Sequence, residues 1–269
     1  MIIRNAVEAG REQANKFVAV DALENCLGQC RVEPLMNDHI MPERPLEIKI
    51  TAEGQREAEL QLLAAAMARA MVVARRENPT VNARIYAECR QENDRLMEQL
   101  ELLGFSNNDM LVRMRRRVFG GPNTFRAPEG CVLVTDDLSD SAERRYFIER
   151  AARLFKREQP EAWLDSVRAK PCFKRFLLSA RNGLAGELLC WAESDCGIIG
   201  HVYTVPAWRQ RGVASFLMEE ARQHFYQYHV AESVIDVRWR MMAVSKLAAT
   251  AGYRRSETLM CLPGIDLDA

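Results

Sequence analysis

The sequence predicts an α+β fold in which a mixed, mostly antiparallel sheet is flanked by helices. Segments with apolar residues at helical spacing alternate with shorter segments of strand-like alternation. Three strand-like segments, 173–180, 185–192 and 198–205, follow one another with only polar or glycine turns between them. A unit of strand, helix, Gly-aromatic pair and strand also occurs twice, with Gly104 and Gly252 in corresponding positions. The fold is therefore expected in tandem.

The first half is expected to alternate between strands and helices. Its strongest helix covers 55–77, because this segment is rich in Ala, Leu, Met, Glu and Arg and is stopped by Asn78-Pro79. Gly104 occupies a plausible C′ position after the following helix. In chain order the elements are a strand at 1–6, a helix over 10–29, a strand at 44–50, helix 55–77, a strand at 83–89, a helix over 92–103 and a strand at 110–114.

The second half is expected to repeat this alternation around the three consecutive strands. Its first helix follows Asp and Ser capping signals, and its second ends before Pro171. In chain order the elements are a strand at 131–135, helices over 141–155 and 160–169, the strands 173–180, 185–192 and 198–205, a helix over 213–226, a strand at 233–239, a helix over 241–251 and a strand at 257–261.

Length and composition favour two domains joined by a linker. A chain of 269 residues can hold two ordinary domains, each with its own core. Segment 117–130 contains Gly-Gly-Pro and Ala-Pro and lacks a long apolar run, which is typical of a linker. The predicted domains are therefore 1–116 and 131–269. The arginines between positions 113 and 126 are expected on a solvated strand edge, and contact with a nucleic acid or an acidic partner stays open as the alternative.

The composition argues against several classes of protein. The 37 basic and 37 acidic side chains cancel, whereas a protein dedicated to nucleic acid needs a sustained basic surface. The first residues lack an apolar leader, and the longest uncharged apolar stretch, 196–208, is too short to span a bilayer. Eight scattered cysteines without paired spacing favour reduced thiols and no metal site. We expect a cytoplasmic protein without nucleic-acid or membrane partners, and its oligomeric state stays open.

An anion-binding motif lies where a predicted strand meets a predicted helix. Unpaired backbone N–H groups at a helix N-terminus point to one spot, and the helix dipole favours negative charge there. Gly212 permits close approach of a ligand, while Arg209 and Arg211 add positive charge. These features indicate a pyrophosphate ligand. The turn follows Pro206 and consists of Arg209, Gln210, Arg211, Gly212, Val213 and Ala214.

The pattern Pro-x-x-Arg-x-x-Gly-x-Ala over 206–214 resembles the acyl-CoA-binding motif of the GNAT superfamily of N-acetyltransferases. The resemblance extends over about 131–261 and is weaker over 1–114. It implies a GNAT-like fold, acetyl-CoA as cosubstrate and direct transfer of the acetyl group to an amine acceptor, a small molecule or a peptide. It also implies that backbone N–H groups from Arg209 to Ala214 bind the pyrophosphate and that Thr204 and Val205 pair with the pantetheine arm.

The chain departs from the family pattern at four places. Many members carry an asparagine near the start of the last helix and a tyrosine seven residues later, where this chain has Met241 and Ala248. The corresponding places in the first half hold Asn93 and Leu100, and segment 51–57 has glutamates in place of the phosphate turn. The resemblance therefore implies a degenerate first half with an architectural role. The acceptor site is implied at about 141–169, which has no dominant charge.

Candidates for proton transfer come from the strands and the last helix. His201 and Glu193 are candidate general bases, because either side chain can accept a proton from an ammonium acceptor. Tyr203, on the same strand as His201, is a further candidate base, and Ser245 on the last helix is a weak candidate acid. A lone histidine on an apolar strand is also typical of a hydrogen-bonded core residue. A non-catalytic acyl-CoA-binding or regulatory module therefore stays open as the alternative to an acetyltransferase.

Overall fold

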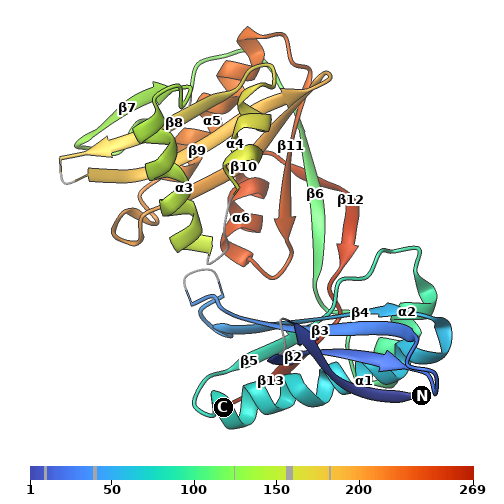
Figure 1. Ribbon diagram of the computed structural model, residues 1–269. Coiled ribbons are helices and arrows are strands. Elements are labelled where there is room, and N and C mark those ends of the chain that lie inside the picture. The colour runs from blue at the N-terminus through green and yellow to red at the C-terminus, as the bar shows by residue number, and fades with distance from the viewer. Residues whose placement is uncertain (9–10, 39–40, 124, 156–159, 182) are drawn as a thin grey trace. The chain divides into compact units, whose positions relative to one another are not determined.

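The computed structural model describes residues 1–8, 11–38, 41–123, 125–155, 160–181 and 183–269 (Figure 1). The chain divides into two compact units. The first unit contains Met1–Leu111 and Thr258–Ala269, and the second unit contains Val112–Glu257. Each unit has its own mixed sheet with helices packed against it, as the sequence predicts.

The first unit is built on a six-stranded sheet in the order β1-β2-β3-β4-β5-β13. Helix α1 packs on one face of β2, β3 and β4, and its Leu62 and Leu63 lie in a fully buried core with Ile48 and Ile85. The elements are β1 Ile2–Glu8, β2 Arg11–Val20, β3 Cys26–Met36, β4 Leu46–Gly54, α1 Arg56–Val72, the π-helical turn η1 Val73–Glu77, β5 Ala83–Tyr86, α2 Asp94–Leu102 and β13 Gly264–Leu267.

The helix expected over 10–29 is wrong, because the structure has the strands β2 and β3 there; Gly10 itself lies outside the described residues. A tight turn reverses the chain between the two strands. The Asp21 carboxylate accepts hydrogen bonds from the N–H groups of Leu23, at 2.8 Å, and Asn25, at 2.9 Å. Glu24 adopts a left-handed φ of 64°. This side-chain-to-backbone bonding favours a turn over a helix.

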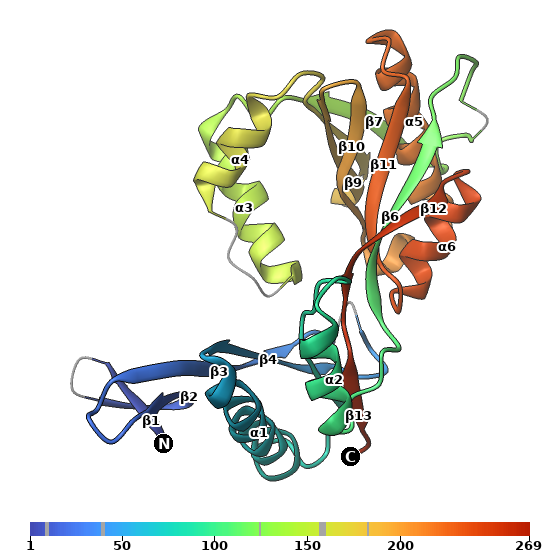
Figure 2. The ribbon, with the colours of Figure 1, turned by 90° about the vertical axis from the view of Figure 1, so that its right-hand side faces the viewer.

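The second unit is built on a seven-stranded sheet in the order β12-β6-β11-β10-β9-β8-β7. Helices α3 and α4 cover one face and α5 covers the other (Figure 2). The elements are β6 Met110–Arg117, β7 Cys131–Asp136, α3 Ser141–Phe155, α4 Glu161–Arg168, β8 Lys174–Ala180, β9 Gly183–Glu193, β10 Cys196–Thr204, the 3-10 turn η2 Pro206–Trp208, α5 Val213–Gln227, β11 Glu232–Arg238, α6 Met242–Thr250 and β12 Arg254–Cys261.

The observed units differ from the predicted domains 1–116 and 131–269 because the chain's last strand belongs to the first unit. Strand β13 pairs antiparallel with β5, with Ile265 opposite Ile85. The fully buried Arg84 side chain donates to Asp266, at 2.8 Å, and to the Leu262 carbonyl, at 2.9 Å. Strand β6 meanwhile lies between β12 and β11 in the second sheet. A strand as short as β13 has too few residues to show a periodic signal.

The segment predicted as a linker, 117–130, is attached to α5 inside the second unit; its Thr124 lies outside the described residues. Arg222 of α5 donates to the carbonyls of Phe119 and Gly121. Asn123 donates to the Glu220 carboxylate at 2.6 Å. These contacts hold the segment in place despite its Gly- and Pro-rich sequence.

The neighbouring arginines form ion pairs. Arg113 donates twice to Asp236, at 2.8 and 2.9 Å, and Arg115 contacts Glu232 at 2.6 Å. Arg116 contacts Glu219 at 3.2 Å. Acidic partners within the second unit therefore compensate much of this basic cluster. Within the described ranges, no helix is long and apolar enough to cross a bilayer.

The predicted internal repeat is present in the structure. Helices α2 and α6 are both nine residues long, and Gly104 and Gly252 follow them with φ of 88° and 87°. Strands β4 and β10, also nine residues each, both pair in parallel with the next strand over only four positions. The two halves therefore share one structural plan.

Candidate functional site

The predicted anion-binding turn connects β10 to α5. Gln210 and Gly212 both adopt left-handed backbone conformations, with φ of 60° and 81°. Gly212 caps α5, whose first backbone N–H groups have no partner within the helix. A Cβ atom at Gly212 would meet nothing within 4 Å, so the space in front of the turn is open. The turn therefore presents N–H groups and the positive end of a helix dipole to an anion.

Two exposed arginines increase the positive charge at this turn. Arg209 and Arg211 both lie at the surface, and the Arg211 guanidinium stands 5.2 Å from the centre of the Trp208 ring. The first turn of α5 carries no acidic side chain. The local charge is therefore suited to a diphosphate, although the whole chain is neutral.

Strands β10 and β11 separate close to this turn. They pair in parallel only from Cys196 to Ile199 on β10, although β11 extends to Arg238. The register of β10 with β9 shifts between Ile199 and His201, which marks a bulge at Gly200. A Cβ at Gly200 would lie 2.0 Å from the Trp191 ring, so only glycine fits the bulge. Beyond Ile199, one edge of β10 thus loses its neighbour.

Beyond this bulge, successive residues of β10 direct their backbone N–H and C=O groups alternately toward β9 and away from it. The Val205 N–H donates to the Ala185 carbonyl at 3.0 Å, and the Val205 carbonyl accepts from Trp208 N–H at 2.8 Å. Alternation then directs the backbone groups of Val202 and Thr204 away from β9, toward the side that β11 leaves. The backbone groups of Thr204 thus face the side that β11 leaves, whereas Val205 bonds within the protein. The sequence analysis did not name Val202 as a candidate binding residue. Which residues of a strand face a given neighbour is known only once the register of the strands is known.

His201 lies on the face of β10 that α3 covers. Its side chain is 6% exposed, and its Nε2 atom is 3.2 Å from Oε1 of Glu187. The ring of Phe147 from α3 packs edge-on against the imidazole, with centroids 5.8 Å apart. His201 is therefore both a buried residue with a charged partner and a titratable group beside the strand separation.

Glu187 is the centre of a buried ionic network that the sequence analysis missed. Its side chain is 1% exposed and accepts two hydrogen bonds from Arg150 and one from Arg175, at 3.2 Å. Arg175 also contacts Asp136 at 3.3 Å and Glu143 at 3.2 Å. Burial alone would raise the pKa of Glu187, but the hydrogen bond from His201 and the charges of His201, Arg150 and Arg175 outweigh it and lower the pKa to about 2. Glu187 therefore remains an anion.

The structure does not bring Glu193 to this place. Glu193 pairs with Cys196 at the opposite end of β10, eight strand steps or about 26 Å from Thr204. Its carboxylate contacts Trp191 and Lys170. Ser245 on α6 donates to the Trp239 carbonyl at 3.4 Å.

The structure shows the surroundings of Ala248 and Met241, the two residues of the last helix that depart from the family pattern. Ala248 of α6 is fully buried, so its surroundings leave no room for a tyrosine side chain. Met241 caps the same helix and makes no side-chain capping bond. The equivalent asparagine of the first unit, Asn93, accepts a hydrogen bond from Leu96 N–H. The capping asparagine has therefore survived only in the first unit.

The corresponding region of the first unit leaves no turn for an anion. Strand β4 ends at Gly54 and α1 begins at Arg56, and Gln55 N–H donates to the Leu27 carbonyl at 2.7 Å. A Cβ at Gly54 would lie 2.7 Å from the Gly28 backbone. Close strand packing thus occupies the place that is open at Gly212. Among the described residues, no group of three or more His, Cys, Asp or Glu side chains is arranged to hold a metal ion.

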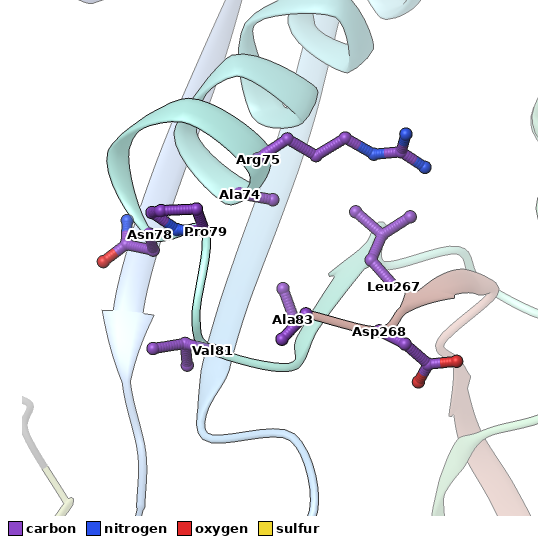
Figure 3. A pocket seen from close by; sticks show the side chains of 9 residues that line it. Ala74, Arg75, Asn78, Pro79, Val81, Ala83, Leu267 and Asp268 are labelled. Atoms are coloured by element: carbon purple, nitrogen blue, oxygen red, sulfur yellow. The ribbon is translucent and has the colours of Figure 1, made fainter.

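A separate pocket lies in the first unit, where α1 ends near the last residues of the chain (Figure 3). It combines apolar and polar side chains and contains none of the residues of the candidate site. Its lining consists of Ala74, Arg75, Asn78, Pro79, Val81, Ala83, Leu267, Asp268 and Ala269.

Comparison with known proteins agrees with this geometry. The family model described as "Acetyltransferase (GNAT) family" matches residues 135–238. A GCN5-related N-acetyltransferase from Sphaerobacter thermophilus is 15% identical, with a TM-score of 0.53 over 97% of this chain and 85% of that one. A probable N-acyltransferase from Enterococcus faecalis is 13% identical, with a TM-score of 0.55 over 93% of this chain and 61% of that one. At these identities the likeness shows the fold.

The chain thus spans about three fifths of the Enterococcus faecalis protein. The search of curated proteins found no match. The family match covers the open turn at Gly212, the separation of β10 from β11 and the bulge at Gly200. The second unit of this chain is therefore a domain of the GNAT acetyltransferase family.

Proposed function

We propose that the protein transfers the acetyl group of acetyl-CoA directly to an amine, on a small molecule or a peptide, in the cytoplasm. One observation carries the proposal: the turn at Gly212 and the exposed edge of β10 adjoin each other along the chain. A diphosphate at the turn would direct the rest of the cosubstrate toward that edge. The same arrangement supports acyl transfer in general, and acetyl-CoA and the amine are the more specific parts of the proposal.

Binding would use backbone groups more than side chains. N–H groups from Gln210 to Ala214 would hold the pyrophosphate, because the Arg209 N–H already donates to the Pro206 carbonyl at 3.2 Å. The side chains of Arg209 and Arg211 would add positive charge. The outward backbone groups of Thr204 and the outward carbonyl of Val202 would pair with the pantetheine arm as a neighbouring strand does. These backbone groups, which face away from β9, would then gain partners when the cosubstrate binds.

The chemistry would occur where β10 and β11 separate. A backbone N–H on β10, with Val202 as the candidate, would polarise the thioester carbonyl and stabilise the oxyanion of the tetrahedral intermediate. The neutral amine attacks the carbonyl carbon, and the C–S bond breaks to release the CoA thiolate. Since a thiol of this kind has a pKa of about 8.5, it leaves without a strong acid. His201 would take the proton of the amine through water.

A non-catalytic acyl-CoA-binding module is the second candidate, favoured by Ala248 and Met241. Ala248 cannot donate a proton to the leaving thiolate, and Met241 has no polar side chain. Both candidates require acyl-CoA binding, so binding alone does not separate them. Release of free CoA thiol in the presence of an amine is expected only from an enzyme.

The test is therefore an assay of thiol release from acetyl-CoA against a panel of amines, peptides and aminoglycosides. The acetyltransferase proposal predicts amine-dependent release and an acetylated product detectable by mass spectrometry. Binding of acetyl-CoA without release across the whole panel would favour the binding module. If acetyl-CoA does not bind at all, both proposals are wrong.

A further inference from the structure

We infer that Glu187 is a positioning residue for the reaction: it fixes the ring of His201 and holds the imidazole proton on Nε2. This inference rests on the proposed function, because it assigns Glu187 to the same acetyl transfer. Glu187 is not assigned by the family motif, which covers the turn at 206–214. The carboxylate acts through His201 and does not touch the substrate.

The hydrogen-bond pattern decides which nitrogen of His201 carries the proton. Oε1 of Glu187 lies 3.2 Å from Nε2 of His201, and an ionised carboxylate only accepts hydrogen bonds. Nε2 must therefore be the donor. A neutral His201 with its proton on Nε2 carries its lone pair on Nδ1, which is the atom that accepts a proton. The carboxylate thus selects one tautomer, as a buried aspartate does beside the histidine of a serine-protease triad.

The neighbours of Glu187 explain why it can hold this role. Arg150 of α3 donates twice and Arg175 of β8 once, so both carboxylate oxygens are occupied by donors and the side chain cannot rotate freely. Phe147 packs against the imidazole from the helix side. The ring of His201 is consequently held on two sides, by the Glu187 carboxylate and by the Phe147 ring.

The charges around His201 balance in a way that depends on Glu187. Without that carboxylate, the guanidinium groups of Arg150 and Arg175 would leave an excess of positive charge beside the imidazole. Tyr203 lies two residues further along β10 and shares this environment, since Arg150 and Glu187 both act on its pKa. The titratable and charged groups that contact His201 or its partners are Glu187 on β9, Arg150 and Glu143 on α3, Arg175 on β8, Asp136 on β7 and Tyr203 on β10.

The first test is a spectrum of the wild-type protein and needs no activity. Long-range ¹H–¹⁵N correlation of ¹⁵N-histidine-labelled protein reports the tautomer of each neutral imidazole, and His201→Asn identifies the signals of His201. The expected result is a proton on Nε2 and a pyridine-like Nδ1. A proton on Nδ1 would overturn the inference. This measurement also avoids the instability that a change at the buried Glu187 can cause.

The second test is the pH–rate profile of acetyl transfer by Glu187→Gln. We expect kcat to fall about 100-fold, as for loss of general-base assistance, with little change in the KM for acetyl-CoA. The acidic limb of the profile is expected to move to lower pH, because Glu187→Gln removes the negative charge beside the imidazole. Glu129→Gln, an exposed carboxylate before β7 in the same unit, is the matched control and should keep the wild-type profile.

A folded Glu187→Gln protein with the wild-type kcat and pH profile would overturn the inference. Glu187→Asp keeps the carboxylate, so it should recover part of the kcat that Glu187→Gln loses. If Glu187 had a purely structural role, Glu187→Asp would recover stability without recovering the wild-type pH profile. If the wild type transfers no acetyl group to any amine, the proposed function fails, and the tautomer of His201 still decides whether Glu187 positions the imidazole.

Discussion

Gly212→Glu is the change that most sharply tests where the pyrophosphate binds. The structure leaves the space in front of Gly212 open, so the new side chain would not collide with the protein. It would place a carboxylate where the diphosphate is expected. At about 5 Å and an effective dielectric constant of about 20, each phosphate charge is repelled by about 3 kcal/mol. Since 1.4 kcal/mol correspond to a factor of ten, the Kd for acetyl-CoA should rise more than about 100-fold.

The backbone strain of this change can be separated from its effect on the ligand. Gly130 has a φ of 76°, close to the 81° of Gly212, and a Cβ there would also meet nothing within 4 Å. Gly130→Glu therefore carries the same left-handed strain, about 1–2 kcal/mol, and the same charge. Isothermal titration with acetyl-CoA should show wild-type affinity for Gly130→Glu and greatly weakened binding for Gly212→Glu. Equal affinities in the two variants would refute the assignment of the turn.

Three further predictions follow from the packing and burial of residues in the second unit. Gly200→Ala should destabilise the protein by about 1–3 kcal/mol in urea unfolding, because its Cβ would overlap the Trp191 ring; an unchanged midpoint would contradict the bulge. Because the pKa of Glu187 is lowered from 4.5 to about 2 on folding, its ionisation should contribute about 3 kcal/mol of stability, fully present above pH 4.5 and lost as the pH falls through 2. The free energy of unfolding of Glu187→Gln should therefore depend less on acid than that of the wild type. The same acid dependence in both proteins would contradict this prediction. Burial raises the pKa of the Cys190 thiol, so a thiol reagent should modify the exposed Cys26 first, as mass spectrometry of digested protein would show.

Local patterns predicted the elements that depend on neighbouring residues. The turn at Gly212 was identified because its glycine, its arginines and the following helix are consecutive in the chain. The repeat was identified because α2 and α6 end at glycines in equivalent positions. Such features need no knowledge of the sheet, and the structure confirms both.

Features set by strand pairing escaped prediction. Segment 10–29 carries apolar residues that fit a helical period, and only the turn at Asp21 and the pairing of β2 with β3 make it a hairpin. Strand β13 is defined by its partner β5 and by the buried Arg84 rather than by its own four residues.

The buried network around Glu187 left one signal in the sequence. Glu187 is a single acidic residue within the largely apolar stretch 184–192, and a charge in such a strand is seldom buried unless it is paired. Its partners Arg150 and Arg175 lie on other elements, so their identity required the fold. The far position of Glu193 likewise became evident only once the direction of β9 was known.

The number of acetyl-CoA molecules bound per chain tests the central claim most directly. The account assigns one working turn, at Gly212, and a first unit whose equivalent place is filled by the Gly28–Gly54 backbone contact. Isothermal titration of the wild type should therefore give one site per chain, and Gly212→Glu should abolish it. No binding, or two sites per chain, would contradict the account.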